Sequence, residues 1–263
     1  MMLDPLLVFY GVIIGISLGL TGSGGSILAI PLLMYGAGLS MSSALIISLF
    51  IVVSISLFGT IRHSLHGQVD WRSAIIFSIS GIIVSPIIIS LTHDINENYR
   101  LVLFAILMLF LASKMWLSTK KDQEKERLEE GAMRYNGVEP IILGGSLAGA
   151  LSGFFGVGGG FIIVPLLTII FGISYKKAIA TSLACISLIS SSAILGYLYH
   201  DVDINYGVMA MFIVGGVIGM VIANKMIGNL NEKIAKRIFA ITTILLAIFM
   251  LFNKFYISQG GAL

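Results

Sequence analysis

Long apolar runs separated by short polar stretches organise the chain, five before a charged stretch near its middle and five after it. The last three runs of each half approach the ~20 residues that a membrane-spanning helix needs, whereas the second run of each half is much shorter. Short apolar runs at matching positions of two halves predict re-entrant or broken helices. The runs cover residues 5–20, 27–38, 44–61, 73–92 and 100–118, then 140–155, 161–173, 178–199, 205–223 and 234–252.

The composition agrees with a chain that lies mostly in lipid. Hydrophobic residues make up 57% of the 263 residues and charged residues only 11%, whereas soluble domains carry roughly 25% charged residues. This balance excludes a cytosolic enzyme, a disulfide-rich secreted scaffold and a disordered chain, and a net charge of +3 gives no reason to expect nucleic acid as a partner. We therefore expect an all-α polytopic membrane protein surrounded by lipids, and a homo-oligomer is compatible with this composition.

The charged stretch predicts a linker between two halves. Residues Lys120–Arg134 contain five basic and five acidic side chains, so this segment is solvated and close to neutral. The predicted organisation is a first transmembrane repeat at 1–119, a charged cytoplasmic linker at 120–139 and a second transmembrane repeat at 140–263.

The two halves are copies of one another. With a shift of 134 residues, thirteen of the thirty-five positions from Gly15 to Leu49 are identical to their counterparts. His66 falls on His200 at the same shift, so the duplication extends over nearly the whole chain.

The distribution of basic residues predicts opposite orientations for the two halves. Lysine and arginine collect in short cytoplasmic loops, and if the linker is cytoplasmic then 14 of the 16 basic residues lie on that side, with only Arg100 and Lys254 outside. This count predicts inverted-topology repeats with both termini outside the cell membrane, and it requires the first two segments of each half to cross zero or two times. The beginning of the chain has no basic region typical of a signal peptide, so we expect the first segment to be retained.

Two glycine-rich clusters interrupt the apolar runs at equivalent places, Gly22–Ser26 and Gly156–Gly160. Glycine allows conformations closed to other residues, and N–H groups at a helix start favour anions. Inverted repeats with interrupted helices are typical of secondary transporters with a site near the membrane midplane. We therefore expect the two clusters to face each other and hold one small oxyanion. Neither cluster is followed by Gly-Lys-Ser/Thr, so a nucleotide P-loop is not indicated.

Helix packing is the alternative role for transmembrane glycines. A four-residue spacing is typical of close helix contacts, whereas consecutive glycines destabilise a helix by about 1 kcal/mol each, which favours a ligand-lining role for the two clusters. The four-residue spacing occurs at Gly11, Gly15 and Gly19, and again at Gly145, Gly149 and Gly153.

The sequence resembles the sulfite exporter family TauE/SafE over essentially the whole chain. The shared features are the doubled glycine-rich stretch ending in Ile30-Pro-Leu-Leu or Val164-Pro-Leu-Leu, Thr181-Ser-Leu with its copy Ile47-Ser-Leu, and the segment from His63 to Trp71. The resemblance implies a multi-pass permease that moves sulfite, sulfoacetate or similar small anions, mostly outward, in bacterial or archaeal cell membranes. It implies substrate contacts from Gly22, Ser23, Gly24, Gly25, Ser26, Ser48, Gly156, Gly158, Gly159, Gly160 and Ser182.

The two clusters are not chemically equivalent, because Val157 and Gly160 replace Ser23 and Ser26. Ser48 and Ser182 occupy equivalent positions, and their hydroxyls are able to donate to an anion or to a carbonyl of their own helix.

Other polar residues give weaker indications. His66 and His200 are candidates for coupling transport to protons, although histidines at helix ends are more often interfacial. Cys185 is interpreted as a packing residue. We expect no metal site and no cofactor, since His200, Asp201 and Asp203 are typical of a solvated loop.

The apolar runs hold almost no acidic or basic residue at mid-depth, which favours an anion held by neutral donors. The predicted function is export of sulfite or a related small anion by alternating access around the two clusters. An anion channel or an uptake permease for another anion is the alternative. An enzyme is not expected, because the Gly-x-Ser-Gly motif of an intramembrane serine protease is missing and Val157 replaces serine in the second cluster.

Overall fold

The computed structural model describes residues 4–22, 24–92, 95–125, 139–156, 160, 163–164, 166–167, 173–197, 203–226 and 240–253, and these residues form helices and connecting loops without a strand. The chain divides into two compact units. The first unit comprises Met1–Asp94 with Gly131–Asn229, and the second comprises Ile95–Glu130 with Leu230–Leu263. Each unit thus takes a segment from both halves of the duplication.

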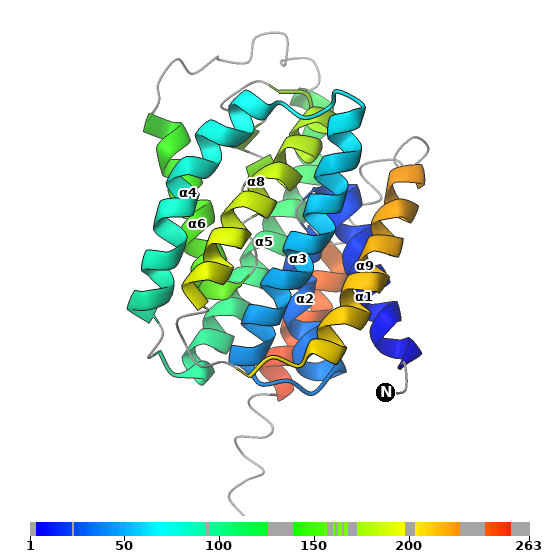
Figure 1. Ribbon diagram of the computed structural model, residues 1–263, viewed down its shortest axis with the longest axis vertical. Helices are drawn as coiled ribbons and strands as arrows, with labels where there is room; N and C mark the ends of the chain where they lie inside the picture. The colour runs from blue at the N-terminus through cyan, green and yellow to red at the C-terminus, as the bar shows by residue number, and fades with distance from the viewer. Residues whose placement is uncertain are drawn as a thin grey trace, which may run out of the picture. The chain divides into compact units, whose positions relative to one another are not determined.

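The first unit is a helical bundle whose elements follow the predicted apolar runs closely (Figure 1). Among the described helices, α3, α4, α9 and Lys176–Tyr197 of α8 are long and apolar enough to cross a membrane. The all-α polytopic fold predicted from the sequence is confirmed. The helices are α1 (Pro5–Thr21), α2 (Gly24–Pro31) with the short π-helical turn η1 (Leu32–Gly36), α3 (Met41–Leu65), α4 (Trp71–Thr92), α6 (Glu139–Phe155), α8 (Tyr175–Tyr197) and α9 (Tyr206–Met226).

Polar residues fix where these helices begin. The Asp4 carboxylate accepts a hydrogen bond from the Leu6 N–H and precedes Pro5, a residue suited to the first helical position. The side chains of Ser40, Asp70 and Asn205 accept in the same way from backbone N–H groups three residues later. Asp70 and Asn205 precede α4 and α9, which the duplication makes equivalent, so the halves share their helix starts as well as their apolar runs.

The helices of the two halves pack against each other through glycine. Helix α1 packs along α9, and its repeat counterpart α6 packs along α4. A Cβ added at Gly15 would meet the backbone of Gly216, and a Cβ added at Gly149 would meet the backbone of Gly81. The two contacts are equivalent, because the duplication aligns Gly15 with Gly149 and Gly81 with Gly216. The predicted packing role of the four-residue glycine spacing in both halves is therefore confirmed.

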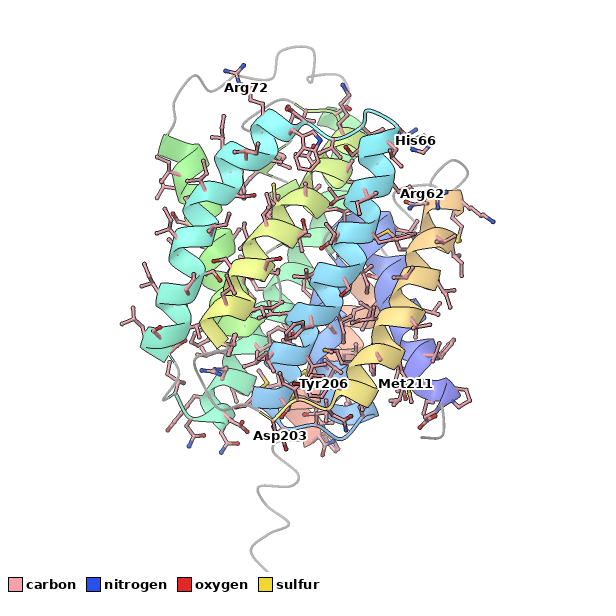
Figure 2. All side chains as sticks on the ribbon, in the orientation of Figure 1. Arg62, His66, Arg72, Asp203, Tyr206 and Met211 are labelled. Atoms are coloured by element: carbon pink, nitrogen blue, oxygen red, sulfur yellow. The ribbon has the colours of Figure 1, made fainter. Side chains whose placement is uncertain are left out.

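Equivalent helices run in opposite directions within the first unit. In Figure 1, α3 and α9 rise from the lower end of the bundle, whereas their counterparts α8 and α4 descend from the upper end. Arg62, His66 and Arg72 consequently lie at the upper end, and Asp203 and Tyr206 lie at the lower end (Figure 2).

The second unit contains α5 (Glu97–Lys125) and a helix over Ala240–Asn253. These helices correspond to the fifth apolar run of each half. Phe104, Ala105, Met108 and Met250 are fully buried.

Candidate functional site

The first glycine-rich cluster forms the tip of a helical hairpin. Helix α1 ends at Gly22, which adopts the left-handed conformation with φ 68°, and α2 begins two residues later. The chain then returns along α1, because a Cβ at Gly25 would meet the Ile14 carbonyl and a Cβ at Gly36 would meet the Tyr10 ring. The hairpin satisfies the topological requirement derived from the basic residues, and Gly25 packs closely against α1.

The second cluster begins in the same way. Helix α6 ends at Gly156, which has φ 62°, and Leu166 contacts the position of Gly144 on α6 as the chain returns. Ser26 and Gly160 are buried at equivalent positions beyond the two breaks. Gly24 lies in the first turn of α2. Three predicted site residues lie outside the described residues, namely Ser23, Gly158 and Gly159, and so does the neighbouring Val157.

Each helix break is bound by a serine from the other half. The Ser182 hydroxyl lies 2.8 Å from the Gly22 carbonyl oxygen, and the Ser48 hydroxyl lies 2.8 Å from the Gly156 carbonyl oxygen. Both serines are fully buried, and each hydroxyl also lies 2.7 Å from the carbonyl three residues earlier in its own helix. The carbonyl at the end of a helix has no helical partner, so these serines provide the hydrogen bond that the break lacks.

These bonds define how the predicted serines act in this conformation. A hydroxyl has a single hydrogen to donate, and here that hydrogen faces two carbonyl oxygens. Ser48 and Ser182 therefore hold the two breaks in place, and their contact with substrate stays a prediction. The same positions explain the glycines, because a Cβ at Gly22 would lie 2.7 Å from the Ser182 hydroxyl and one at Gly156 would lie 3.0 Å from the Ser48 hydroxyl.

The two breaks lie at different depths along the bundle. Helix α8 contacts the first break through Ser182, and it reaches the second hairpin through Tyr197, whose hydroxyl donates to the Gly153 carbonyl at 3.0 Å. Fifteen residues separate Ser182 from Tyr197, which corresponds to about 22 Å along the helix axis. Helix α3 gives about 16 Å, since Ser48 binds the second break and Gly59, eleven residues later, contacts Leu183 next to Ser182.

This separation revises the expected shape of the site. The sequence predicted two clusters that face each other and hold one anion near the midplane. A small oxyanion spans a few ångströms, which is less than this separation, so contact of one anion with both clusters stays a prediction. The first break lies toward the end of the bundle that carries Arg62 and Arg72, and the second toward the end that carries Asp203 (Figure 2).

The two candidate coupling histidines differ in what the structure shows. His66 is exposed at the end of α3, and its Nδ1 lies 2.7 Å from the Arg62 carbonyl oxygen. His200 and Asp201 lie outside the described residues, so the role of this pair stays a prediction. Within the described part of the chain, no three His, Cys, Asp or Glu side chains are grouped to hold a metal ion.

Cys185 is fully buried in α8, where its sulfur lies 3.7 Å from the Ala74 carbonyl oxygen of α4. This contact between two packed helices agrees with the interpretation of Cys185 as a packing residue.

The sequence did not identify the residues that join α8 to the loop before α4. The Asp70 N–H donates to the Thr181 hydroxyl at 3.1 Å, next to Ser182 on α8. A signal for the cross-repeat bonds was present, however. Each half keeps one glycine at its break and one serine 26 residues later, as in Gly22 with Ser48. If the two halves pack against each other, each glycine pairs with the equivalent serine of the other half.

Apolar membrane-length helices, two hairpins interrupted at glycine and a duplicated bundle define the class of this molecule as a polytopic α-helical membrane protein with the architecture of a transporter. Comparison with known proteins gives the family: the model of the sulfite exporter TauE/SafE family matches residues 7–250, and the chain belongs to this family.

Relatives named as probable membrane transporter proteins support this assignment. One from Xylella fastidiosa is 31% identical over 249 residues, which cover 93% of each chain. One from Methanocaldococcus jannaschii is 31% identical over 209 residues, covering 77% of this chain and 75% of the relative. One from Haemophilus influenzae is 32% identical over 201 residues, covering 72% and 71%. The protein is a membrane transporter, in agreement with the non-enzymatic function predicted from the sequence.

Proposed function

We propose that this transporter exports a small anion, sulfite or a related sulfur-containing or organic anion, by alternating access between two inverted repeats. The observation that carries the proposal is the pair of equivalent helix breaks, each bound by a serine of the other half. The opposite directions of α3 and α8 and of α4 and α9 support the inversion of the repeats.

The interior of the first unit favours an anion that is held by neutral groups. The described helices of this unit carry charged side chains only in their terminal turns, such as Arg62 in α3 and Lys177 in α8. A cation site would need buried carboxylates, whereas backbone N–H groups and hydroxyls are able to hold an anion without a buried base. Neutral donors also bind an anion less tightly than an ion pair, which suits release on the far side.

The charges at the two ends of the first unit support an orientation. The described basic side chains of this unit belong to the end where α3 and α9 finish and α4 and α8 begin, whereas Asp203 lies at the opposite end. Basic residues are retained on the cytoplasmic side, so the basic end is cytoplasmic in our proposal and the chain begins outside the cell. The basic residues of this end are Arg62, Arg72, Lys176, Lys177 and Lys225.

Reconstituted vesicles test the function. Purified protein is placed in liposomes loaded in parallel with sulfite, thiosulfate, sulfoacetate or acetate, and efflux is compared with that from protein-free liposomes. We expect protein-dependent efflux of at least one sulfur-containing anion, together with uptake of label against its gradient when unlabelled anion is present in excess on the other side. Flux only down the gradient, without exchange, would indicate a channel. No flux of any of the four anions in either orientation would refute the substrate proposal.

A further inference from the structure

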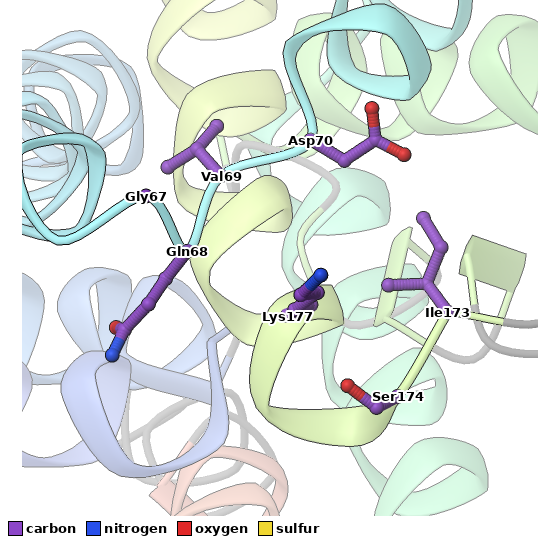
Figure 3. Close-up of a pocket in the computed structure, with 7 residues that line it drawn as sticks. All are labelled: Gly67, Gln68, Val69, Asp70, Ile173, Ser174 and Lys177. Carbon is purple, nitrogen blue, oxygen red and sulfur yellow. The ribbon is translucent and has the colours of Figure 1, made fainter.

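A water-accessible cavity of about 540 Å³ lies at the basic end of the first unit. Figure 3 shows the loop between α3 and α4, with Gln68 and Asp70, lying across the start of α8; Ser174 directly precedes this helix and Lys177 lies in its first turn. Cavities of 300–1,000 Å³ accommodate small molecules, so this one has ample room for an anion of a few non-hydrogen atoms.

The cavity is lined by one acidic side chain, Asp70, and one basic side chain, Lys177, and only the acidic one is held by neighbouring groups of the described residues. The Asp70 carboxylate is occupied at the start of α4, where it accepts from the Ser73 N–H at 3.3 Å and from the Ser73 hydroxyl at 2.8 Å. Lys177 is exposed and forms no ion pair with a carboxylate of the described residues. Its ammonium is therefore available to an incoming anion, and Ser174, which also lines the cavity, offers a hydroxyl as a further donor.

The cavity lies close to the first helix break along α8. Thr181 lies one turn beyond Lys177 on α8, about 6 Å along the axis, and accepts a hydrogen bond from the Asp70 N–H at 3.1 Å. The next residue, Ser182, holds the Gly22 carbonyl. One turn of α8 therefore separates the cavity lysine from the tip of the first hairpin.

The opposite end of the bundle lacks this charge. The duplication places Ser43 at the position of Lys177 and Ser42 at that of Lys176, while Ser40 and Ser174 are identical. Ser43 is buried, and its hydroxyl lies 3.1 Å from that of the helix-capping Ser40. The basic side chain is thus a feature of one mouth of the transporter.

We propose that the cavity at Lys177 is a loading site that binds a small sulfonate, sulfite or carboxylate anion before it reaches the Gly22 break. The proposal rests on anion transport as the function and deepens it, because it assigns the end of the molecule at which substrate is collected. One exposed ion pair holds the anion weakly, so the site raises the local concentration of substrate and does not retain it.

Substitution of Lys177 tests the site, and the neighbouring lysine provides a matched control. Lys177→Ser and Lys176→Ser remove the same charge from the same helix turn, but only Lys177 lines the cavity. We expect Lys177→Ser to raise the KM for efflux from the Lys177 face about threefold to fivefold with kcat unchanged, the size of effect typical of one exposed ion pair. Lys177→Arg should restore the KM, and the difference should vanish in about 1 M salt, where the Debye length is about 3 Å.

A direct measurement separates the cavity from the transport proposal. Detergent-solubilised protein is acetylated with an amine-reactive ester, with and without sulfoacetate, and the modification of each lysine is followed by peptide mass spectrometry. We expect sulfoacetate to slow acetylation of Lys177 and to leave Lys176 unchanged. Protection of Lys177 without flux of any anion would support the site and refute the proposed function. Flux with equal behaviour of Lys176→Ser and Lys177→Ser, or with no protection of Lys177, would refute the site and leave the function standing.

Discussion

The serine bonds at the two breaks predict that equivalent substitutions open opposite ends of the transporter. Ser182→Ala removes the hydrogen bond to the Gly22 carbonyl, and Ser48→Ala removes the bond to the Gly156 carbonyl. Because α8 contacts the first break at Ser182 and the second hairpin at Tyr197, about 22 Å further along its axis, each substitution should loosen only its own end.

The size of the effect follows from one lost hydrogen bond. Each serine hydroxyl also lies close to a carbonyl of its own helix, that of Leu45 or Ile179. That carbonyl still accepts a helical backbone hydrogen bond when the hydroxyl is removed, so it is not left unsatisfied. The carbonyl at the break is left without its partner, which costs about 1–3 kcal/mol in a protein interior, whereas side-chain hydrogen bonds in membrane proteins average about 0.6 kcal/mol. A value of about 1 kcal/mol corresponds to a fivefold rise in the population of the opened end.

Cysteine labelling measures this population at each end. Cys185, the single cysteine, is first replaced by alanine, and a new cysteine is placed at Ile179 beside Gly22 or at Leu45 beside Gly156. The labelling rate with a membrane-impermeant maleimide is proportional to the open fraction of each end. We expect Ser182→Ala to raise the rate at position 179 about fivefold and to leave position 45 unchanged.

The reverse pattern is expected for Ser48→Ala, and Ser182→Thr, which keeps a hydroxyl, should label at the parental rate. Equal acceleration at positions 45 and 179 by either alanine variant would show that the bundle loosens as a whole. No acceleration at either position would show that the serine bonds do not hold the breaks. Both results would refute the reasoning.

Three further outcomes follow from the packing and direction of the helices. Gly149→Leu should abolish the folded protein in size-exclusion chromatography, because its Cβ would meet the Gly81 carbonyl oxygen, whereas Leu147→Ala, at an exposed position of the same helix, should be tolerated. Single cysteines at Gly67 and Asp203 should label from opposite sides of the membrane in intact cells, and labelling from one side would contradict the inverted arrangement. Tyr197→Phe removes the hydrogen bond to α6 and should lower the melting temperature by a few degrees, as expected for about 1 kcal/mol.

Most of the helix positions could be predicted because the information is local. The apolar runs at 44–61 and 73–92 became α3 and α4, and both helices extend beyond the runs to polar capping residues, Ser40 and Asp70. A local pattern of apolar residues, caps and glycines is enough to define such elements. The break at Gly22 was predictable for the same reason, since a glycine in the left-handed conformation ends α1.

The contacts between helices that are far apart in the sequence could not be predicted from such local patterns. Ser48 meets Gly156, 108 residues away, and the apolar pattern of α3 gives no information about which hairpin lies beside it. The separation of the two breaks could not be predicted either, because it depends on the length of the helices that lead to them and not on the equivalence of the halves. The cavity at Lys177 also escaped notice, since its wall combines a loop before α4 with the start of α8.

The length of α1 and α6 explains why the breaks are far apart. Each helix has 17 residues and is therefore about 25 Å long, close to the ~30 Å thickness of the hydrocarbon core. A hairpin that starts at one face and has an arm of this length places its tip near the opposite face. Two hairpins that start at opposite faces then place their tips at opposite mouths, where each is held by a serine of the other half. In the proposed alternating access, opening a mouth would move one tip against one helix of the other repeat, and the bond at the other mouth would stay intact.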